Sequence, residues 1–449
     1  MITPSRQSRI VADVLVVGAG PAGIACSVRA AECGSRVLLV DRAAQPGGQI
    51  WRHSRAAART ATLPAGARKW LRRLARSSAT FSAGTTIVDA QRSGDGFEIT
   101  ADASGEPLRL HVQRIVLATG ARELFVPFEG WTLPGVMGIG GTQALYKSGA
   151  SFHGKRVAIA GSGPLMLPVA ASMRAAGAKV VLLAEQASFH AVWNFALGLV
   201  RSPTTLFQAA GYRARLAGVR YSAGTWVTKA IGRHALETIS VTNGRRTWQL
   251  DADILCTGYG LVPNIELALL LGCDVSEGAV LVNERQESSV PGVFAAGEAT
   301  AIGGAAMSLA EGEIAGYAVA GVGAPPALLS AAKRYGRDAK RMRFAFSLRW
   351  ELRRITTPST IVCRCEDVRF ESVCTFPSAR QAKLYSRTAM GPCQGRTCMP
   401  SLEYLLGWTA DTVRPPVEST LLRNLLREGA FDAPSTSPPS NRSVEEAIR

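Results

Sequence analysis

The sequence predicts an α/β protein with two Rossmann-like dinucleotide-binding units and a small helical module at its carboxyl end. Two glycine-rich turns, at residues 18–23 and 161–166, each follow a short apolar strand and precede a helix rich in small residues. The composition then changes at Gly323, and five of the nine cysteines lie between residues 363 and 398. With 449 residues, the chain is long enough for two or three domains.

Composition places the chain among globular proteins. The 45 glycines and a hydrophobic content of 47% are typical of α/β domains. Nine cysteines, an odd number, argue against a secreted disulfide framework and favour a reducing compartment. The amino terminus has no apolar signal region, and no apolar run reaches the roughly 18 residues of a membrane span. We therefore expect a cytoplasmic protein without a transmembrane segment.

The formal net charge of +17 is concentrated in two stretches. Residues 52–76 contain eight basic and no acidic residues, and residues 333–354 contain nine basic against two acidic ones. Neither stretch carries a nucleic-acid-binding motif. We expect both to be solvated helix faces that meet an acidic partner protein or bound phosphates, and we expect no nucleic acid.

The first glycine turn belongs to a complete βαβ pattern. A buried strand at residues 14–17 leads into the turn, a helix covers 24–33, and a second strand covers 37–40. In such a unit the first glycine makes the tight turn, the second lets a pyrophosphate approach the backbone, and the third lets helix and strand pack closely. The acid that ends the second strand is placed for a ribose hydroxyl. The predicted cofactor-binding residues here are Gly18, Gly20, Pro21, Ala22, Gly23, Asp41 and Arg42.

The second glycine turn is a degraded copy. Strands at 156–160 and 180–184 flank a helix at 167–176, and Met166 replaces the third glycine, so helix and strand cannot pack as closely. The terminal acid would favour NAD over NADP. A working nicotinamide site and a vestigial one are equally compatible with this pattern. The candidate residues are Gly161, Gly163 and Glu185.

Three further strands end in glycine, at residues 115–120, 252–258 and 292–297. The order of GxGxxG, GGQ, ATG, GSGP, TG and VFAAGE resembles flavoproteins of the thioredoxin reductase and ferredoxin reductase kind, the pyridine-nucleotide-disulfide reductase type, over about residues 10–322. The resemblance implies an FAD-binding domain at 10–135 and 255–322 and an NAD(P)-binding-like domain at 136–254. It also implies FAD contacts from Gly48, Gln49, Thr119, Gly120, Gly297 and Glu298, with the last acid on the ribityl chain.

The sequence also departs from this family. No Cys-x-x-Cys or Cys-x4-Cys pair accompanies the flavin motifs, so we expect no thiol redox chemistry there. The five histidines are scattered, and no acid–base or nucleophilic arrangement emerges. We therefore predict no catalytic residue on this chain.

The C-terminal cysteines form two pairs separated by 27 residues. Structural zinc sites mostly space their cysteines two to four residues apart, whereas a 2Fe–2S cluster needs four thiolates and accepts more varied spacing. We favour the cluster, and a zinc site and four buried apolar cysteines are the alternatives. Cys374, between the pairs, is expected to be a spare core residue. The predicted metal ligands are Cys363, Cys365, Cys393 and Cys398.

The region after residue 322 divides into a basic linker or helix at 323–357, a 2Fe–2S domain at 358–428, and a disordered tail at 429–449 rich in Ser and Pro. The cysteine module resembles bacterioferritin-associated ferredoxin. Together with the flavoprotein motifs, it resembles the α subunits of multi-subunit amino-acid dehydrogenases, namely opine oxidases, D-hydroxyproline dehydrogenase, multimeric proline dehydrogenases and hydrogen cyanide synthases. The resemblance implies a hetero-oligomer with an amine-oxidising flavoprotein β subunit, and as a further candidate a small ferredoxin-like subunit.

Three functions follow as hypotheses. The first is a subunit that relays electrons from the amine-oxidising partner through FAD and a 2Fe–2S cluster. The second is a self-sufficient reductase that takes electrons from NAD(H). The third is a nucleotide-bound scaffold without redox activity, which Glu298 argues against, since a site for adenine nucleotide alone needs no acid at the ribityl position.

Overall fold

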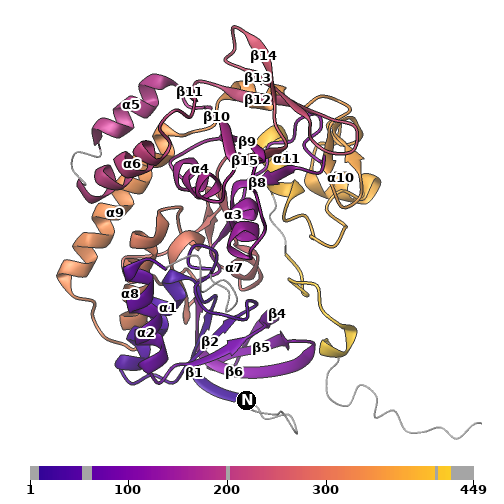
Figure 1. Ribbon diagram of the computed structural model, residues 1–449. Helices are drawn as coiled ribbons and strands as arrows, with labels where there is room; N and C mark the ends of the chain where they lie inside the picture. Colours follow the sequence, from indigo (N-terminus) through magenta and orange to yellow (C-terminus); the bar gives the residue numbers. More distant parts are fainter. Residues whose placement is uncertain (1–9, 53–62, 199–202, 410–412, 426–449) are drawn as a thin grey trace, which may run out of the picture.

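The computed structural model describes residues 10–52, 63–198, 203–409 and 413–425, and it contains two sheet-based halves (Figure 1). The predicted tail at 429–449 lies outside the described residues. The lower half in Figure 1 contains a seven-stranded sheet of order β3-β2-β1-β6-β5-β4, with β19 paired to β6. Its strands are β1 (Ile10–Val17), β2 (Val37–Asp41), β3 (Thr80–Ala83), β4 (Thr85–Ser93), β5 (Gly96–Ala103), β6 (Glu106–Leu117) and β19 (Val293–Ala295).

The central strands of this sheet are parallel and buried. β1 pairs in parallel with β2 and β6, and the side chains of residues 14–16 are fully buried, as expected for a strand covered on both faces. α1 (Pro21–Glu32) and α8 (Gly304–Val319) cover one face. They approach closely because Gly312 and Gly316 of α8 lie against the α1 backbone at Ala22 and Cys26.

The upper half contains a five-stranded parallel sheet of order β11-β10-β9-β15-β8 and a separate three-stranded antiparallel sheet (Figure 1). The predicted boundary at residue 255 falls inside β15, which pairs with β9 in this second sheet. The strands are β8 (Val136–Gly138), β9 (Arg156–Gly161), β10 (Lys179–Glu185), β11 (Tyr221–Ala223), β15 (Ile254–Gly258), and the antiparallel β12 (Trp226–Ile231), β13 (Thr238–Thr242) and β14 (Thr247–Asp251).

Helices and short ribbons complete the two halves. A two-stranded antiparallel ribbon of β7 and β16 lies in the two segments that connect the halves. The remaining elements of this region are α2 (Ala65–Arg76), α3 (Ile139–Lys147), α4 (Met166–Ala175), α5 (Phe189–Gly198), α6 (Pro203–Arg215), α7 (Glu266–Leu270), β7 (Ala121–Glu123), β16 (Leu261–Pro263), β17 (Val275–Ser276), β18 (Ala279–Val280) and the 3-10 turn η2 (Gly297–Ala299).

The basic stretch at 333–354 folds into the long helix α9 (Pro326–Ala345) and the short 3-10 helix η3 (Trp350–Arg354). α9 contacts α8 of the first half and α5 of the second, and it runs along one side of the molecule in Figure 1. Part of its charge is paired within the chain, because Lys333 binds Glu284 and Arg343 binds Glu277.

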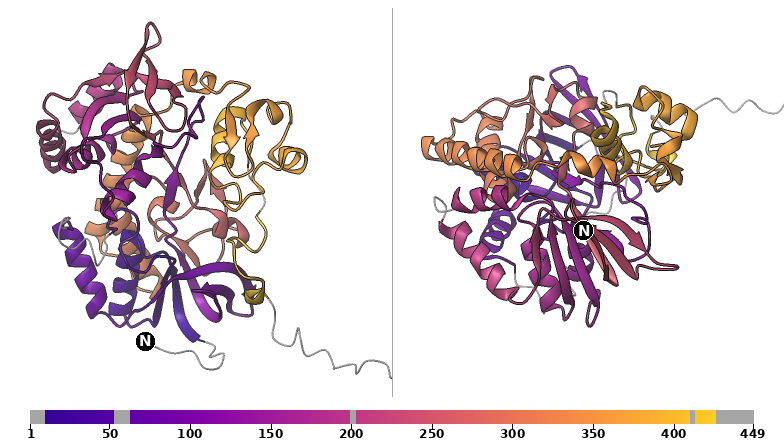
Figure 2. Two further views of the ribbon diagram at one scale, coloured as in Figure 1. Left: turned by 45° about the vertical axis from the view of Figure 1, so that its right-hand side comes forward. Right: turned by 90° about the horizontal axis from the view of Figure 1, so that it is seen from above.

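The cysteine module lies beside the upper half, and the chain afterwards returns to the first sheet (Figure 2). The sequence predicts a helical module, but the structure begins it with a two-stranded ribbon that carries Cys363. The backbone N–H of Val417 donates to the Val88 carbonyl oxygen, and Asn424 donates to Asp102, so the returning segment is fixed to β4 and β5. The module contains β20 (Ile361–Cys363), β21 (Val368–Arg369), η4 (Phe370–Ser372), α10 (Ala379–Ser386) and α11 (Cys398–Leu406), and η5 (Leu422–Asn424) follows on the first sheet.

Candidate functional site

The first glycine turn joins β1 to α1 and has the local geometry that its sequence predicts. Gly18 has a φ of 105°, and a Cβ there would overlap the Ala118 carbonyl oxygen. A Cβ on Gly23 would overlap the Gly18 carbonyl oxygen, so only glycine lets α1 begin this close to the turn. The Cβ direction of Gly20 is open, with nothing within 4 Å. The turn therefore leaves room above Gly20 and faces it with the N-terminus of α1, which favours a phosphate group.

Asp41, at the end of β2, ties the strand to this turn. Its Oδ2 accepts a hydrogen bond from the Ala19 N–H at 2.7 Å, and its Oδ1 accepts one from the Ala43 N–H at 2.7 Å. Each carboxylate oxygen can accept a further hydrogen bond, and the side chain is only half-buried. Asp41 can therefore hold the turn and still face a ribose hydroxyl.

Other predicted segments converge on the same place. The Gly47 N–H donates to the Ala19 carbonyl oxygen at 2.7 Å, and Gly48 lies directly against Gly20. Gly297 faces the first turn of α1, where a Cβ would come within 2.7 Å of Ala22 Cβ. Residues far apart in the chain thus surround one helix N-terminus. Gln49, predicted to lie against the flavin, is exposed, and its side chain has no hydrogen-bond partner among the described residues.

Glu298 follows Gly297, and its partly buried carboxylate has no hydrogen-bond partner among the residues that the structure describes. Burial raises its pKa above the ordinary value of 4.5. Removing a carboxylate from water in this way costs free energy unless a ligand supplies hydroxyl or N–H groups that donate to it. Together with the open space at Gly20, Glu298 makes this site fit FAD, whose ribityl hydroxyls would satisfy the carboxylate.

Two positioning residues carry no signal in the sequence. Glu311 on α8 accepts hydrogen bonds from the Gly297 N–H at 2.8 Å and the Thr300 hydroxyl at 2.9 Å, and burial raises its pKa to about 7. The Asn264 backbone carbonyl oxygen accepts a hydrogen bond from the Thr119 hydroxyl at 2.6 Å, and the Asn264 side-chain amide donates one to the Thr119 carbonyl oxygen at 2.8 Å. Glu311 and Asn264 both position turns that are predicted to contact the flavin. Their roles can be recognised only from their contacts in the folded chain.

Arg42, a predicted cofactor-binding residue, is paired within the chain. Its guanidinium forms an ion pair with Glu418 of the returning C-terminal segment at 3.1 Å, and its side chain is 67% exposed. Arg42 therefore connects β2 to the segment that follows the cysteine module.

The second glycine turn joins β9 to α4 and holds its acid differently. Glu185, only 1% exposed, accepts from the Gly163 N–H at 2.8 Å and from the Ala187 N–H at 2.8 Å. Burial raises the pKa of Glu185 to about 7. Gly161 is packed against the Gly258 backbone, and Met166 is buried in the core of this half. Residues 346–349 lie over this turn.

The four predicted metal ligands are brought into two interacting pairs. The Cys398 thiol and the backbone N–H groups of Ala389, Glu366 and Cys365 stabilise the Cys363 thiolate and lower the pKa of Cys363 to about 5. Hydrogen bonding with Cys363 raises the pKa of Cys398. Cys365 and Cys393 form the second interacting pair of thiols.

The loop that carries Cys393 lies against Cys365, because a Cβ on Gly391 would meet the Cys365 side chain. Within the described ranges, no three His, Cys, Asp or Glu side chains stand in an arrangement that could hold a metal ion directly. In donor type and number, however, four thiols among backbone N–H groups fit a four-thiolate cluster. Cys374 stands apart: it is exposed, where the sequence predicted a core residue.

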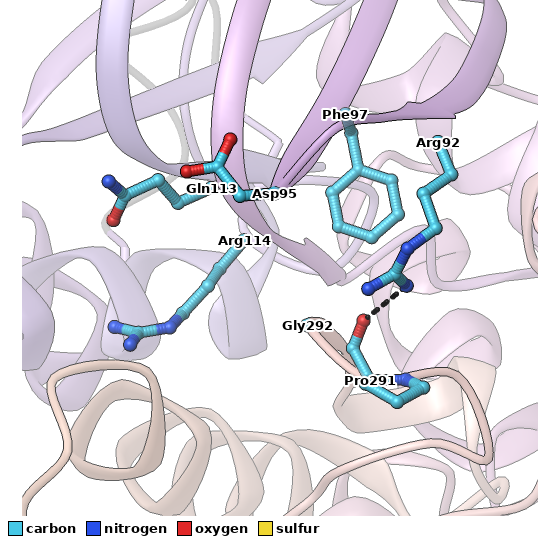
Figure 3. A pocket seen from close by; sticks show the side chains of 7 residues that line it. All are labelled: Arg92, Asp95, Phe97, Gln113, Arg114, Pro291 and Gly292. Carbon is cyan, nitrogen blue, oxygen red and sulfur yellow. Dashed lines mark hydrogen bonds between the residues drawn. The ribbon is translucent and has the colours of Figure 1, made fainter.

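A surface pocket of about 360 Å³ is lined by residues of β4, β5 and β6 and of the loop that precedes β19 (Figure 3). Gly292, which lines it, precedes β19, whereas dinucleotides bind at the carboxyl ends of parallel strands. Arg92 donates to the Pro291 carbonyl oxygen at 3.1 Å in this pocket. The pocket is therefore separate from the predicted cofactor site. Its lining residues are Arg92, Asp95, Phe97, Gln113, Arg114, Pro291 and Gly292.

The sequence pattern of the pyridine nucleotide-disulphide oxidoreductases matches residues 12–320, more than half of the chain. The chain belongs to this family. It is accordingly an FAD-dependent oxidoreductase with an α/β dinucleotide-binding fold, and family members combine FAD with a nicotinamide dinucleotide. Among the described residues, no helix is both long enough and apolar enough to cross a membrane.

Similar proteins cover nearly the whole chain. An opine oxidase subunit from Rhizobium meliloti (strain 1021) is 32% identical over 90% of this chain and 96% of its own length. Hydrogen cyanide synthase subunit HcnB of Pseudomonas aeruginosa is 31% identical over 89% of this chain and 92% of its own. The crystal structure of L-proline dehydrogenase from P. horikoshii shares the fold, with a TM-score of 0.67, 19% identity, and coverage of 94% of this chain and 81% of that chain.

Proposed function

We propose that this chain is the electron-relay subunit of a heteromeric amino-acid or opine dehydrogenase. In this proposal FAD lies at the first glycine turn and a 2Fe–2S cluster lies on the four C-terminal cysteines. The observation that carries the proposal is the gathering of these cysteines on a chain whose flavin-facing turns contain no thiol pair. Cys363 and Cys398 lie in one buried cluster, and Gly391, in the loop that carries Cys393, lies against Cys365.

Relatives support the subunit role. The similar opine oxidase and hydrogen cyanide synthase proteins are both named as subunits of larger enzymes, and this chain covers more than nine-tenths of their lengths. We infer a hetero-oligomer with an amine-oxidising flavoprotein partner. The residues that select the amine substrate would belong to that partner.

The chain's own residues supply binding and orientation. The N–H groups at the start of α1 would bind the pyrophosphate, Asp41 the adenosine ribose and Glu298 the ribityl chain. Gly303 precedes α8, so the positive end of that helix would stabilise a reduced, anionic flavin. Bound together, FAD and the cluster would convert two-electron input into single-electron output, because flavins exchange one or two electrons and a 2Fe–2S cluster exchanges one.

The four cysteines would hold the cluster through their thiolates. The Cys398 thiol, together with the backbone N–H groups directed at Cys363, lowers the pKa of the Cys363 thiol, as thiolate ligands require. Cys363 and Cys398 are buried, whereas Cys365 is exposed and Cys393 is half-buried, so Cys365 and Cys393 lie on the solvent-facing side of the site.

The test compares the isolated chain with the co-expressed complex under anaerobic conditions. We expect proline, hydroxyproline, opines and glycine to leave the flavin of the isolated chain oxidised, and one of them to reduce an artificial dye through the complex. Rapid bleaching of the isolated chain's flavin by an amine would place the substrate site on this chain and overturn the proposal.

A pair of cysteine variants tests the cluster. Cys393→Ser should remove bound iron and its visible absorbance while FAD is retained, and dye reduction by the complex should slow. Cys374→Ser is the matched control, because Cys374 is exposed and outside the paired cysteines. Equal iron content in the two variants would contradict the assignment.

A further inference from the structure

The second glycine turn is covered by the chain's own segment Phe346–Arg349, which connects α9 to η3. The Ser162 hydroxyl, in the middle of the turn, donates to the Phe346 carbonyl oxygen at 2.9 Å. Gln186, directly after the acid Glu185, donates through Nε2 to the Ser347 carbonyl oxygen at 3.1 Å and to Ser162 Oγ at 2.8 Å. The Ser162 hydroxyl and the Gln186 side-chain amide are therefore already bonded within the chain.

The Phe346 side chain lies where a dinucleotide would approach. The glycine at the Gly163 position exists in dinucleotide-binding turns so that a pyrophosphate can come close to the backbone. Here the open side of Gly163 faces the Phe346 ring, whose nearest atom is 3.9 Å from the position of a Cβ. The same ring packs edge-on against Phe195 of α5, with the ring centroids 5.1 Å apart. An apolar ring thus occupies the approach to Gly163.

The segment is fixed at its other end as well. The Arg349 N–H donates to Gln186 Oε1 at 3.1 Å, and the Arg349 guanidinium stacks over the Trp226 ring at 4.6 Å. The Arg349 carbonyl oxygen accepts from the Tyr404 hydroxyl at 2.9 Å, which ties the segment to α11 of the cysteine module. Leu352, three residues further on, is fully buried in the core of the second half.

We propose that the segment Phe346–Arg349 is the resident occupant of the second dinucleotide site and excludes nicotinamide dinucleotides from this chain. NAD(P), which the family implies, does not fit here, because its pyrophosphate would have to displace the Phe346 ring and break the bonds of Ser162 and Gln186. A ligand that must first displace a seated segment binds only in proportion to the fraction of open molecules. The second unit serves instead to mount the linker that carries the cysteine module.

The decisive measurement is a titration of the full chain, saturated with FAD, with NADH, NAD⁺, NADPH and NADP⁺, followed by saturation-transfer NMR of the ligands. We expect no saturable binding at millimolar ligand, and no bleaching of the flavin by NADH. Saturable binding of any of the four, with the flavin site filled, would overturn the proposal. This readout is separate from the relay function, which is tested by amines and the partner.

Two phenylalanines two residues apart show whether the segment is seated in solution. Phe346→Ala removes the ring that covers Gly163, whereas Phe344→Ala removes a ring that is 86% exposed on the same part of the chain. We expect Phe346→Ala to lower the melting temperature by roughly 2 °C or more and to increase cleavage near Arg349 by a protease, while Phe344→Ala matches the wild type. Equal behaviour of the two variants would show that the segment does not occupy the site.

Discussion

The two glycine turns of this molecule share a sequence pattern and have opposite surroundings. At the first, the approach to Gly20 is open, and the carboxylate of Glu298 remains available to a ligand. At the second, the approach to Gly163 is covered by Phe346, and Glu185 is fully buried. In both, the acid at the strand end bonds to N–H groups of its own turn. In each unit the acid thus connects the strand end to the glycine turn. Whether a ligand can bind depends on whether the approach to the second glycine of the turn is open or covered.

The largest difference in FAD retention is expected between the variants Gly23→Ala and Gly163→Ala. A Cβ on Gly23 would overlap the Gly18 carbonyl oxygen and displace α1 from the turn, so Gly23→Ala should weaken FAD retention by about 100-fold or more. Gly163→Ala should leave FAD in place and cost about 1–3 kcal/mol of stability, because its φ is 98°. Flavin absorbance per protein after desalting measures the first effect, and urea unfolding the second. Equal flavin loss in both variants would break the comparison.

Substitution of Glu298 tests whether the first turn is the one that faces a ligand. Glu298→Ala should weaken FAD binding by roughly 10- to 100-fold, the range expected on loss of a hydrogen bond to a charged group. The fold should persist, because Glu298 contributes no side-chain hydrogen bond among the described residues. Glu284→Ala is the control, since that carboxylate is exposed and paired with Lys333. Unchanged FAD affinity in Glu298→Ala would remove Glu298 from the site.

The buried Glu185 gives the second turn a pH dependence of its own. Its pKa is about 7 in the folded chain against an ordinary 4.5, so the folded state retains a proton that the unfolded state has lost between these pH values. The free energy of unfolding should therefore fall as the pH rises from about 4.5 to about 7, with Glu185 contributing on the order of 3 kcal/mol or less.

Glu185→Gln should flatten this decline, although Glu311, with a pKa also raised to about 7, keeps its own share. Urea unfolding at a series of pH values measures the slope. A slope identical to that of the wild type would mean that Glu185 is ionised in the folded protein at neutral pH.

The smallest effect on FAD affinity and stability is expected from substitution of Arg42, which follows Asp41, the acid of the first turn. Its ion pair with Glu418 is largely exposed on the arginine side, and such pairs contribute about 0–1 kcal/mol. Arg42→Ala should leave FAD affinity unchanged and stability within that range. A loss of FAD affinity of about 10-fold would instead restore Arg42 as a cofactor-binding residue.

Much of the fold follows from local sequence. The apolar strands, the glycine turns and the acids at 41 and 185 define two βαβ units, because each pattern depends on neighbours within about 30 residues. The predicted strand and helix positions agree with β1, α1, β9 and α4 to within a few residues.

The fold class, the family and most of the residues that gather at the first turn could be predicted from the sequence. The covering of the second turn could not be predicted, because the residues that cover it come from a basic stretch about 180 positions later, with no local signal that it would fold back. The tertiary structure also decided the roles of Glu311 and Asn264 and the ion pair of Arg42 with Glu418. These contacts join segments that are distant in the chain, and their partners are selected by packing rather than by sequence periodicity.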